Sequence, residues 1–372
     1  MYLTELKMYD FRNHGSIDLS FSPYLNCFIG NNAMGKTNIL EAVYYLSTLA
    51  SFRAAKDEDL IRWGKEAFSL MATLQTKNYN YSLKTKVSSK RKIYLINDAK
   101  KEKSSDFVGH LKTVFFSPED LSLIKGGPQY RRSFLDHFLS QLFPSYHHYL
   151  VKYKKLLRQK NVYLRELKTK KTVDFDLLEV YNQQLVQIAA WITLKRLNIL
   201  KKILPLAKEY HAKINMDEEL NLNYQSCVPL DSTALTYEYL TQKYLVAVKD
   251  VQKEEIAKCM SLVGPQRDDV FISVNKKNLK EYGSQGQQRT ATIALKLAQA
   301  EVFRSELGEN PIILLDDIFS ELDEKRRNNI LDMITRDMQV FITATDKELI
   351  PEIYRKEAII FKLTKENVLQ EG

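Results

Sequence analysis

The stretch with the clearest chemistry is an eight-residue segment with a glycine at each end of a turn and a Lys-Thr pair behind it. Residues 30–37 match the pattern G-x-x-x-x-G-K-[ST] of a phosphate-binding loop. In such a loop, backbone amides at the start of a helix point at the phosphates. Lys36 can reach the β- and γ-phosphates, and the Thr37 hydroxyl can hold Mg²⁺. We therefore predict that a nucleoside triphosphate is bound by Gly30, Asn31, Asn32, Ala33, Met34, Gly35, Lys36, Thr37 and Asn38.

Two adjacent acids end a continuous apolar run near the C-terminus. The run is Pro311 to Leu315, and Asp316 and Asp317 follow it, as in a Walker B motif. Such a run suits a strand that is buried on both faces of a parallel sheet. Ligands bind at the carboxyl end of such strands, so Asp316 is predicted to hold Mg²⁺ and Asp317 to orient or deprotonate the attacking water. Lys36 and Asp317 are the catalytic candidates. The alternative is a core strand with an acidic surface turn.

A third candidate lies between these two motifs in the sequence. Ser284, Gln285 and Gly286 precede a long, alanine-rich helical pattern. Ser284 offers a hydroxyl, and Gly286 lets backbone amides approach an anion at the start of a helix. Taken alone, the segment is an ordinary helix cap. Its position about 30 residues before the acidic strand favours a role in nucleotide binding.

The elements around these motifs predict an α/β fold with two parts. A short strand at 25–29 precedes the phosphate-binding loop, and a helix over 38–46 follows it. Alternating runs predict an antiparallel flank over 2–10, 14–21, 68–76, 79–87 and 92–96, with turns at Lys77-Asn78 and Asn97-Asp98. Helical patterns fill 144–209, with a break at 169–174, and 232–258. We predict a head domain over 1–117 and 261–372, and a mainly helical inserted lobe over 118–260.

Composition limits the class of protein. A chain of 372 residues can form about two domains, and with 44% hydrophobic and 27% charged residues it is typical of a globular protein. No apolar run approaches the roughly 20 residues of a membrane helix, and the first residues do not resemble a secretion signal. Three widely spaced cysteines fit no metal or redox motif and favour a reducing, cytoplasmic setting. The net charge of +9 is compatible with a polyanionic partner.

Together the motifs resemble those of ABC-type ATPases. Ser320-Glu321-Leu322-Asp323 resembles their D-loop, and Phe341 to Thr345 occupies their switch position. The resemblance narrows to the bacterial RecF family, relatives of the SMC heads. It is carried by the motifs above together with Phe11-Arg12-Asn13, Ser51-Phe52-Arg53, Ser117-Pro118-Glu119-Asp120, Arg131-Arg132 to Asp136, and Gly264-Pro265-Gln266-Arg267-Asp268-Asp269.

This resemblance implies an ABC-type head that binds ATP and Mg²⁺ and forms a head-to-tail dimer. Ser284 and Gly286 of one copy would then face the phosphate-binding loop of the other. By position, Arg12 and Arg53 are candidates to touch the nucleotide, although each is also consistent with a surface arginine packed on a loop. The usual catalytic Glu is Asp317 here, and the usual switch His is absent near Thr343, so slow hydrolysis is expected. The Q-loop glutamine has no clear position.

The resemblance further implies an ATP-dependent DNA-binding protein of recombinational repair and replication. Its ATPase would be stimulated by DNA, whether single-stranded, double-stranded or a junction, and its partners would be RecR and RecO. Basic stretches predict DNA contacts, mainly to phosphates, by Lys90, Arg91, Lys92, Lys100, Lys101, Lys152 and Lys155. The second stretch continues along the helix through Lys160 to Lys171, and a third is Lys195, Arg196, Lys201 and Lys202. For any one stretch, a solvated helix face is the competing interpretation.

Two other functions are open at this level. A transporter nucleotide-binding subunit would share the ATPase motifs, but the missing switch His and the long helical insertion argue against it. A structural adaptor would use ATP only to assemble, while partner proteins hold the DNA. Sequence alone does not separate the adaptor from a DNA-binding ATPase.

Overall fold

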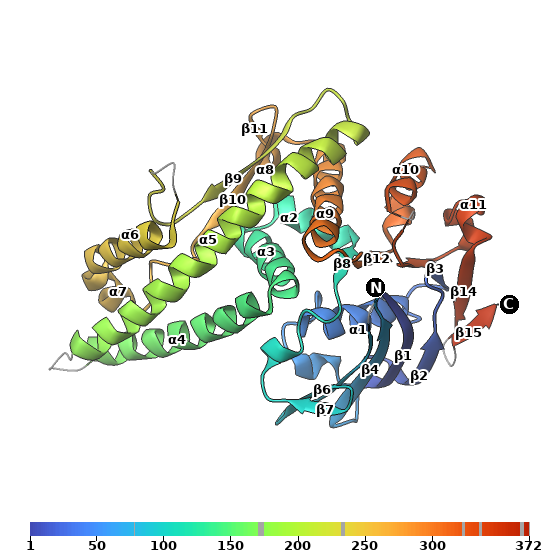
Figure 1. Ribbon diagram of the computed structural model, residues 1–372, viewed down its shortest axis with the longest axis horizontal. Coiled ribbons are helices and arrows are strands. Elements are labelled where there is room, and N and C mark those ends of the chain that lie inside the picture. The colour runs from blue at the N-terminus through green and yellow to red at the C-terminus, as the bar shows by residue number, and fades with distance from the viewer. Residues whose placement is uncertain are drawn as a thin grey trace.

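The computed structural model describes residues 1–77, 79–169, 175–231, 235–321, 324–334, 337–364 and 368–371. Two lobes make an elongated molecule, with the sheets of the head at one end and a long helical hairpin at the other (Figure 1). Both termini lie on the head. Within the described ranges, no helix is both long enough and apolar enough to span a bilayer.

A six-stranded sheet, mostly parallel, forms the centre of the head. Its order is β15-β14-β3-β13-β12-β8, and only β15 runs antiparallel to its neighbour. The strands are β3 (Leu25–Ile29), β8 (Thr113–Phe116), β12 (Ile312–Asp316), β13 (Val340–Ala344), β14 (Ala358–Leu363) and β15 (Val368–Glu371). Every residue of β12 is buried, as the apolar run predicted.

Each face of this sheet contributes to a different hydrophobic core. Ile312 and Leu314 of β12 pack on the side of α1 (Lys36–Thr48), the helix after the phosphate-binding loop, whereas Ile313 and Leu315 pack on the side of the inserted helical lobe, called lobe II below. Alternation of this kind follows from the period-2 geometry of a strand. A strand covered on both faces has no polar face, which explains the unbroken apolar run before Asp316.

An antiparallel sheet covers the other side of α1, as predicted. Its order is β2-β1-β4-β5-β6-β7. The strands are β1 (Tyr2–Phe11), β2 (His14–Ser20), β4 (Ala67–Gln75), β5 (Asn80–Ser88), β6 (Lys92–Ile96) and β7 (Ala99–Lys101). The turn at Asn97-Asp98 is confirmed, with both residues at positive φ. Of the other predicted turn, Asn78 lies outside the described residues.

Lobe II is built from helices α3 to α7, and its longest members form the hairpin. They are α3 (Pro128–Leu142), α4 (Pro144–Thr169), α5 (Phe175–Ile214), α6 (Tyr237–Asp250) and α7 (Gln252–Lys258). The predicted break at 169–174 falls largely on residues 170–174, outside the described part of the chain. Of the second predicted block, 232–258, residues 232–234 lie outside the described part of the chain, and the described helix α6 begins at Tyr237.

A small sheet continues lobe II beyond the predicted boundary at residue 260. Strands β9 (Leu220–Gln225), β10 (Asp269–Val274) and β11 (Lys277–Asn278) pair in the order β11-β10-β9. Strand pairing therefore keeps residues 269–278 with lobe II. The chain returns to the head through α8 (Leu279–Tyr282) and α9 (Gln285–Leu307), which packs on α5 and β8.

Short helices complete the described structure. They are η1 (Asp57–Leu60), η2 (Ser104–Asp106), η3 (Pro118–Leu121), α2 (Ser122–Lys125), η4 (Ile318–Glu321), α10 (Glu324–Ile334), η5 (Lys347–Leu349) and α11 (Glu352–Arg355). The helix predicted to start after Ser117 is the 3₁₀ helix η3, with Pro118 at its first position, and α2 continues it. This segment joins the head to lobe II.

Candidate nucleotide-binding site

The phosphate-binding loop connects the central strand β3 to the start of α1. Gly35 caps α1 with φ 91°, a conformation that glycine adopts without steric cost. A Cβ at this position would also collide with the side chains of His14 and Asn13. The buried Lys36 ammonium donates to the carbonyl oxygens of Gly30 (2.5 Å) and Asn31 (3.0 Å). Lys36 is thus held across the mouth of the loop, where a phosphate can replace the carbonyls as its acceptor.

The acidic pair lies beside this loop, at the carboxyl end of β12. The Asp316 carboxylate accepts hydrogen bonds from the hydroxyls of Thr37 (2.8 Å) and Thr343 (2.7 Å). Burial raises the pKa of Asp316, while the two hydroxyls and the charge of Arg53 oppose that rise. Burial lowers the pKa of Lys36, and the carboxylates of Asp317 and Asp316 oppose that change. The structure therefore brings the two predicted motifs into one site.

Asp317 differs from its neighbour in having an unsatisfied oxygen. Its backbone is in the left-handed region with φ 49°, and its amide donates to the Thr343 hydroxyl at 2.9 Å. Its buried Oδ1 has no hydrogen-bond partner among the described residues. Buried polar atoms are normally paired, so an unpaired one calls for an explanation such as an absent ligand or water. The position suits the predicted role of orienting a water molecule.

The donor set fits Mg²⁺. A threonine hydroxyl and an aspartate carboxylate meet at Thr37 and Asp316, and both offer oxygen atoms. Magnesium is usually bound by one or two carboxylates together with nucleotide phosphates and water. Over the ranges that the structure describes, no three His, Cys, Asp or Glu side chains converge as a metal site. Thr37 and Asp316 would thus supply the protein ligands, and the bound ion would neutralise phosphate charge.

Glu41 organises both arginine candidates and was not singled out from the sequence. This fully buried carboxylate accepts two hydrogen bonds from Arg12 (2.7 and 2.8 Å) and one from the Ser51 hydroxyl (2.5 Å). Ser51 in turn accepts hydrogen bonds from the amides of Arg53 and Ala54. The signal for Glu41 was a single acid within the apolar pattern of α1. Arg12 is therefore anchored rather than free on the surface, and its contact with the nucleotide stays a prediction.

The turn between β1 and β2 is fastened to the start of α1. Asn38 donates to the Asn13 side chain at 2.7 Å, and a His14 ring nitrogen lies 3.1 Å from the Gly35 carbonyl oxygen. Burial lowers the pKa of His14, and the hydrogen bond to Gly35 opposes that change. The antiparallel flank thus frames one side of the phosphate-binding loop.

A cleft of about 850 Å³ separates the head from lobe II next to this site. Arg53 is exposed and lines the cleft, and the stacked rings of Phe52 and Phe115, with centroids 3.9 Å apart, also line it. The charge of Arg53 also opposes the rise in the pKa of Asp316 that burial causes. This supports, without testing, the prediction that Arg53 touches the nucleotide.

The third motif is a helix cap on α9 that faces solvent. Ser284 and Gln287 form a reciprocal capping box, and both Ser284 and Gln285 are exposed. A Cβ at Gly286 would meet the Ser284 hydroxyl oxygen at 3.8 Å, which is an ordinary van der Waals contact. Gln287 also donates to Glu218 at 2.7 Å, and α8, which precedes the cap, packs on β10. The cap therefore belongs to lobe II rather than to the acidic pair of its own chain.

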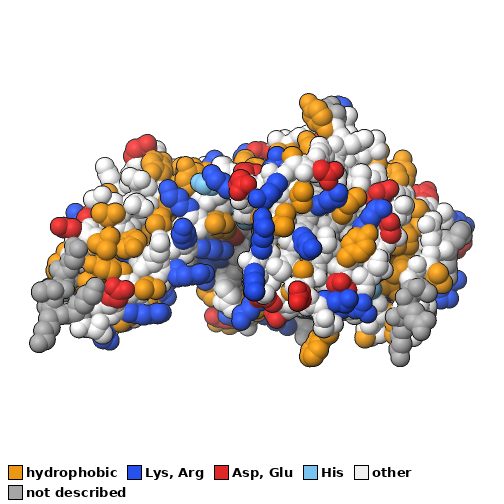
Figure 2. All heavy atoms as spheres, turned by 90° about the horizontal axis from the view of Figure 1, so that it is seen from below, with side chains coloured by type: hydrophobic (Ala, Val, Ile, Leu, Met, Phe, Trp, Pro, Cys, Tyr) orange, Lys and Arg blue, Asp and Glu red, His pale blue; other side chains and the backbone are white. Residues whose placement is uncertain are grey.

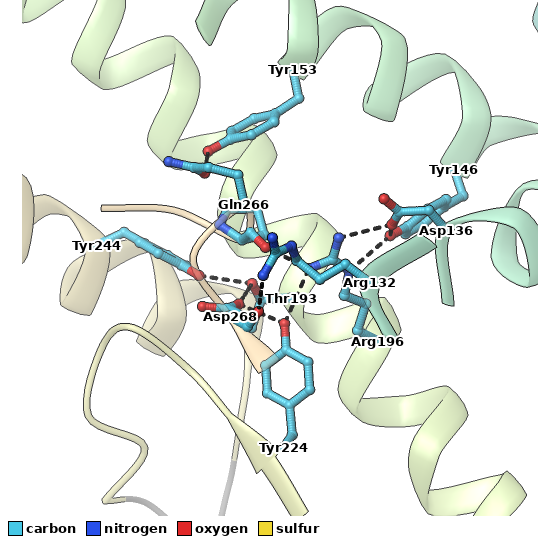
Figure 3. A network of polar contacts seen from close by, with 11 residues as sticks. Arg132, Asp136, Tyr146, Tyr153, Thr193, Arg196, Tyr224, Tyr244, Gln266 and Asp268 are labelled. Atoms are coloured by element: carbon cyan, nitrogen blue, oxygen red, sulfur yellow. Dashed lines mark hydrogen bonds and ion pairs between the residues drawn. The ribbon is translucent and has the colours of Figure 1, made fainter. Parts of the chain in front are cut away.

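The 264–269 motif forms the centre of a buried network in lobe II (Figure 3). Asp268 accepts hydrogen bonds from the Tyr224 hydroxyl (2.5 Å) and the Cys227 amide (2.8 Å), and Arg196 donates to Asp136 (2.8 Å) and to the Pro265 carbonyl oxygen (2.7 Å). We call this cluster the lobe II network; its members are Arg132, Asp136, Tyr146, Tyr153, Thr193, Arg196, Tyr224, Tyr244, Gln266 and Asp268. It joins α3, α4, α5, α6 and β9 to the loop before β10.

The structure corrects two of the basic stretches. Lys160 is 1% exposed and paired with Glu255 at 2.6 Å, and Arg196 belongs to the lobe II network. Neither side chain can reach a phosphate backbone. Lys170 and Lys171 lie outside the described residues.

The residues predicted to contact DNA all lie on solvent-facing elements. Lys90, Arg91 and Lys92 are at the turn between β5 and β6, and Lys92 is paired with Asp57. Lys100 and Lys101 are on β7, where Lys101 is only partly exposed. Lys152 and Lys155 are exposed on α4, which contacts η2 just after β7. The structure therefore places Lys100 and Lys101 near the helix that carries Lys152 and Lys155.

Comparison with known proteins identifies the family. The family model described as "RecF/RecN/SMC N terminal domain" matches residues 2–368. The chain is 40% identical over 364 residues to the DNA replication and repair protein RecF of Geobacillus sp. (strain WCH70), covering 98% of this chain and 97% of that protein. It is 38% identical to RecF of Bacillus subtilis (strain 168), with 98% of each covered.

Solved structures agree with the sequence comparison. One described as "Structure of the recombination mediator protein RecF-ATP in RecFOR pathway" superimposes with a TM-score of 0.92 at 31% identity, covering 100% of this chain and 98% of the other. An SMC head bound to the winged-helix domain of ScpA matches with a TM-score of 0.58 at 14% identity, which shows a shared fold only. A phosphate-binding loop, an acidic strand end and this overall likeness lead to one conclusion: the chain belongs to the RecF family of DNA replication and repair proteins, ATP-binding members of the RecF/SMC head ATPases.

Proposed function

We propose that this protein binds ATP with Mg²⁺ and, in that state, forms a head-to-tail homodimer that holds DNA. Slow hydrolysis of ATP then releases the dimer. Gly30 to Asn38, with Arg12 and Arg53, contact the nucleotide in one copy, and Ser284 and Gly286 of the second copy complete the site. Asp317 orients the attacking water, and Lys36 stabilises charge on the transferred phosphoryl group.

One observation carries this proposal: the two predicted nucleotide-binding motifs of the chain lie on different lobes. Lys36, Thr37 and Asp316 lie together in the head, where Lys36 donates to the Gly30 carbonyl oxygen and Thr37 donates to Asp316. The exposed Ser284 cap is on the other lobe, at the start of α9. A second copy, related by a two-fold axis, would bring each half to the other and create two equal sites. The solved relative named RecF-ATP supports ATP as the nucleotide.

Slow hydrolysis follows from the chemistry of the acidic pair. Asp317 is one methylene shorter than the glutamate usual in ABC-type ATPases. Thr343 binds both Asp316 and the Asp317 amide, so a hydroxyl occupies the switch position instead of a histidine. A threonine cannot exchange protons near neutral pH as histidine does. Such a site suits a timed switch more than a motor.

DNA is the proposed partner of the dimer, bound through phosphates. Figure 2 shows one face of the elongated molecule. On this face, Lys and Arg side chains gather around the hollow between the two ends of the molecule. Lys152 and Lys155 are exposed on α4, and Lys100 lies on the neighbouring edge of the head. Contacts of this kind depend steeply on salt. RecO and RecR are proposed as partners, since a solved relative is described within the RecFOR pathway.

A cytoplasmic location is also proposed. Cys27, Cys227 and Cys259 are all free thiols in the fold. Disulfides are rare in reducing compartments, so three unpaired cysteines are consistent with the cytoplasm.

The decisive experiment measures mass and DNA retention together. With ATP and Mg²⁺, light scattering should show a dimer, and a filter assay should show retained DNA at low salt that declines steeply at higher salt. Lys36→Arg should prevent both by misplacing the charge that meets the γ-phosphate. Ser284→Arg should leave ATP binding to the monomer within about threefold, because it alters only the other half of the site, yet still block the dimer.

Two results would contradict the proposal. A Lys36→Arg protein that still dimerised on ATP would separate dimerisation from the phosphate-binding loop. Retention of DNA by neither the monomer nor the ATP-bound dimer would favour the structural adaptor, with DNA held by other proteins. The transporter alternative is set aside, because the family is that of replication and repair proteins.

A further inference from the structure

Three acids follow one another in the turn between α5 and β9, and only the middle one faces inward. Asp217 and Glu219 are exposed, and Glu219 is paired at the surface with Lys208 at 2.7 Å. The side chain of Glu218 is only 12% exposed, and its Oε1 accepts a hydrogen bond from the side-chain amide of Gln287 at 2.7 Å. Lobe II thus presents one carboxylate to the first turn of α9.

The backbone around Glu218 is held on both sides. Before it, the Asn215 amide donates to the His211 carbonyl oxygen at 2.8 Å, where α5 ends. After it, the Glu219 amide donates to the Asn275 side chain at 2.8 Å, and the Asn275 amide donates to the Glu219 carbonyl oxygen at 3.0 Å. Asn275 lies in the turn between β10 and β11. The end of α5 and the small sheet together therefore fix the segment that carries the carboxylate.

The second oxygen of Glu218 faces a buried histidine. This oxygen, Oε2, is 3.6 Å from Nε2 of the fully buried His211. Neither Oε2 nor either ring nitrogen of His211 has a hydrogen-bond partner among the described residues. A rotation of the carboxylate away from Gln287 would leave both of its oxygens unpaired in a largely buried place, which costs free energy. The bond to Gln287 therefore holds Glu218 in this orientation.

The carboxylate also determines which end of the Gln287 amide faces the cap. A side-chain amide accepts through its oxygen and donates through its nitrogen, whereas an ionised carboxylate only accepts. Glu218 therefore binds the Gln287 nitrogen, and the Gln287 oxygen is left to accept from the Ser284 backbone amide at 2.8 Å. A reversed amide would place donor against donor and acceptor against acceptor. Glu218 thus selects the orientation that closes the capping box of α9.

A closed capping box leaves the Ser284 hydroxyl proton available. The hydroxyl oxygen accepts from the Gln287 backbone amide at 3.2 Å, and a hydroxyl has one proton to donate besides. Ser284 is exposed, so this proton can be donated to an acceptor outside the chain, such as a phosphate oxygen. Without the Gln287 oxygen, the Ser284 backbone amide loses its acceptor and the residue is free to leave the cap.

We propose that Glu218 is a positioning residue for the composite nucleotide site, because it fixes Gln287 and so aims the Ser284 hydroxyl at the ATP of the partner subunit. Glu218 itself touches neither nucleotide. This inference rests on the proposed function, and it names the residue of lobe II that prepares the cap before the dimer forms.

Two neighbouring carboxylates of the same turn supply matched variants, Glu218→Ala and Glu219→Ala. The first readout is hydrogen exchange of the Ser284 amide in the monomer without ATP, followed residue by residue by NMR. Exchange should be about fivefold or more faster in Glu218→Ala than in wild type, because one hydrogen-bonded partner of the cap is lost. Glu219→Ala should exchange at the wild-type rate, since its carboxylate meets only the surface.

Dimerisation is the second readout. With ATP and Mg²⁺, Glu218→Ala should raise the dissociation constant of the dimer by about tenfold or more. ATP affinity, measured at protein concentrations too low for dimers, should stay within about threefold of wild type. Glu218→Gln keeps an acceptor for the Gln287 nitrogen, and its own amide can donate to the unpaired His211 ring. This conservative variant should bring both readouts to within about threefold of wild type.

Several outcomes would overturn the inference. They are a wild-type exchange rate at Ser284 in Glu218→Ala, faster exchange there without weaker dimerisation, or equal loss of the dimer in Glu219→Ala, which would indicate an effect of net charge. Glu218→Met, which fills a similar volume without an acceptor, replaces Glu218→Ala if the latter does not fold. Failure of the proposed function is a separate result: a wild-type protein that stays monomeric with ATP removes the dimer, whereas exchange at Ser284 still reports whether Glu218 holds the cap.

Discussion

The nucleotide site and the lobe II network contain the same kinds of side chain, yet they use them differently. In the network, the Arg196 guanidinium meets the Asp136 carboxylate and the Pro265 carbonyl, and Asp268 meets Tyr224 and the Cys227 amide. Charges and acceptors there satisfy each other. At the nucleotide site, Lys36 donates to two backbone carbonyl oxygens, and Asp317 Oδ1 has no partner among the described residues.

This difference distinguishes a structural cluster from a binding site. Buried polar groups that are fully paired specify one arrangement of the chain. Groups left partly unsatisfied retain the capacity to bind something else, and perturbed ionisable groups gather at such places. The acidic residues of 264–269 are as prominent in sequence as Asp316 and Asp317, but Asp268 is fully buried and paired, whereas Asp317 has a buried oxygen with no partner among the described residues.

The largest effect is expected from breaking the network. Burial alone would raise the pKa of Asp136, but Arg196 and the other neighbouring donors hold it below its usual range. Arg196→Met leaves that carboxylate with a poorer set of partners and should cost roughly 3–5 kcal/mol of unfolding free energy. The measurement is urea denaturation. The double variant Arg196→Met with Asp136→Leu should recover much of the loss, because no buried charge is left alone.

ATP affinity is the control for that comparison. The folded Arg196→Met protein should bind ATP within about threefold of wild type, since Arg196 does not touch the nucleotide site. If Arg196→Met lost ATP affinity but kept its unfolding free energy, the lobe II network would be part of nucleotide binding and not a separate structural cluster.

A pH-dependent effect of intermediate size is expected at the junction of the two regions. Burial lowers the pKa of His137 to about 4, and Lys154 and Lys296 act in the same direction, whereas Asp136 opposes them. His137 lies 2.9 Å from the Tyr44 hydroxyl of α1. Between pH 4 and pH 6.5, the unfolded chain binds a proton that the folded chain does not, so stability is full above this window and is lost as pH falls through it.

The matched variant is His137→Gln, which cannot take up a proton. Between pH 7 and pH 4.5 the wild type should lose up to about 2.5 kcal/mol more stability than His137→Gln. His147, whose pKa burial also lowers to about 4, stays in both proteins and so cancels. Parallel pH profiles for the two proteins would contradict the assignment.

The smallest effect is expected from one hydroxyl in the nucleotide site. Thr343→Val keeps the shape but removes the donor to Asp316 and the acceptor of the Asp317 amide. Loss of a buried hydrogen-bond partner costs about 1–3 kcal/mol, so ATP hydrolysis should slow by roughly tenfold, with ATP affinity within about threefold. Thr343→Ser retains the hydroxyl and should hydrolyse ATP like wild type. An equal fall in affinity and rate would place Thr343 in binding rather than in positioning Asp317.

Much of the head could be predicted, because its elements have strong local patterns. The glycines around Lys36 require a turn, and the apolar run before Asp316 requires a strand covered on both faces. The phosphate-binding loop and the acidic strand end could be expected to meet at one site, because parallel strands end at the same edge of a sheet. The buried parallel strand before Asp316 and the meeting of the two motifs at Thr37 and Asp316 are both confirmed.

The failures came from residues whose neighbours are distant in sequence. Lys160 and Arg196 are indistinguishable from surface cations in a helical pattern, and only Glu255 and Asp136, brought near by folding, show that they are buried. The pairing of β10 with β9 likewise joins segments that are distant in sequence, on the two sides of the boundary predicted at residue 260. Glu41 was hidden within an apolar helix, because its partners Arg12 and Ser51 come from two separate loops.

The sequence by itself determined which chemistry this protein carries: a phosphate-binding loop, an acidic strand end, a capped alanine-rich helix and a basic chain. These depend on residue type and short spacing, which local sterics and hydrogen bonding decide. Only the tertiary structure decided which charges are free to act. Burial and pairing depend on contacts between distant segments, and these turned Arg196 into a structural residue, left Asp317 unsatisfied, and linked Glu218 to the cap of α9.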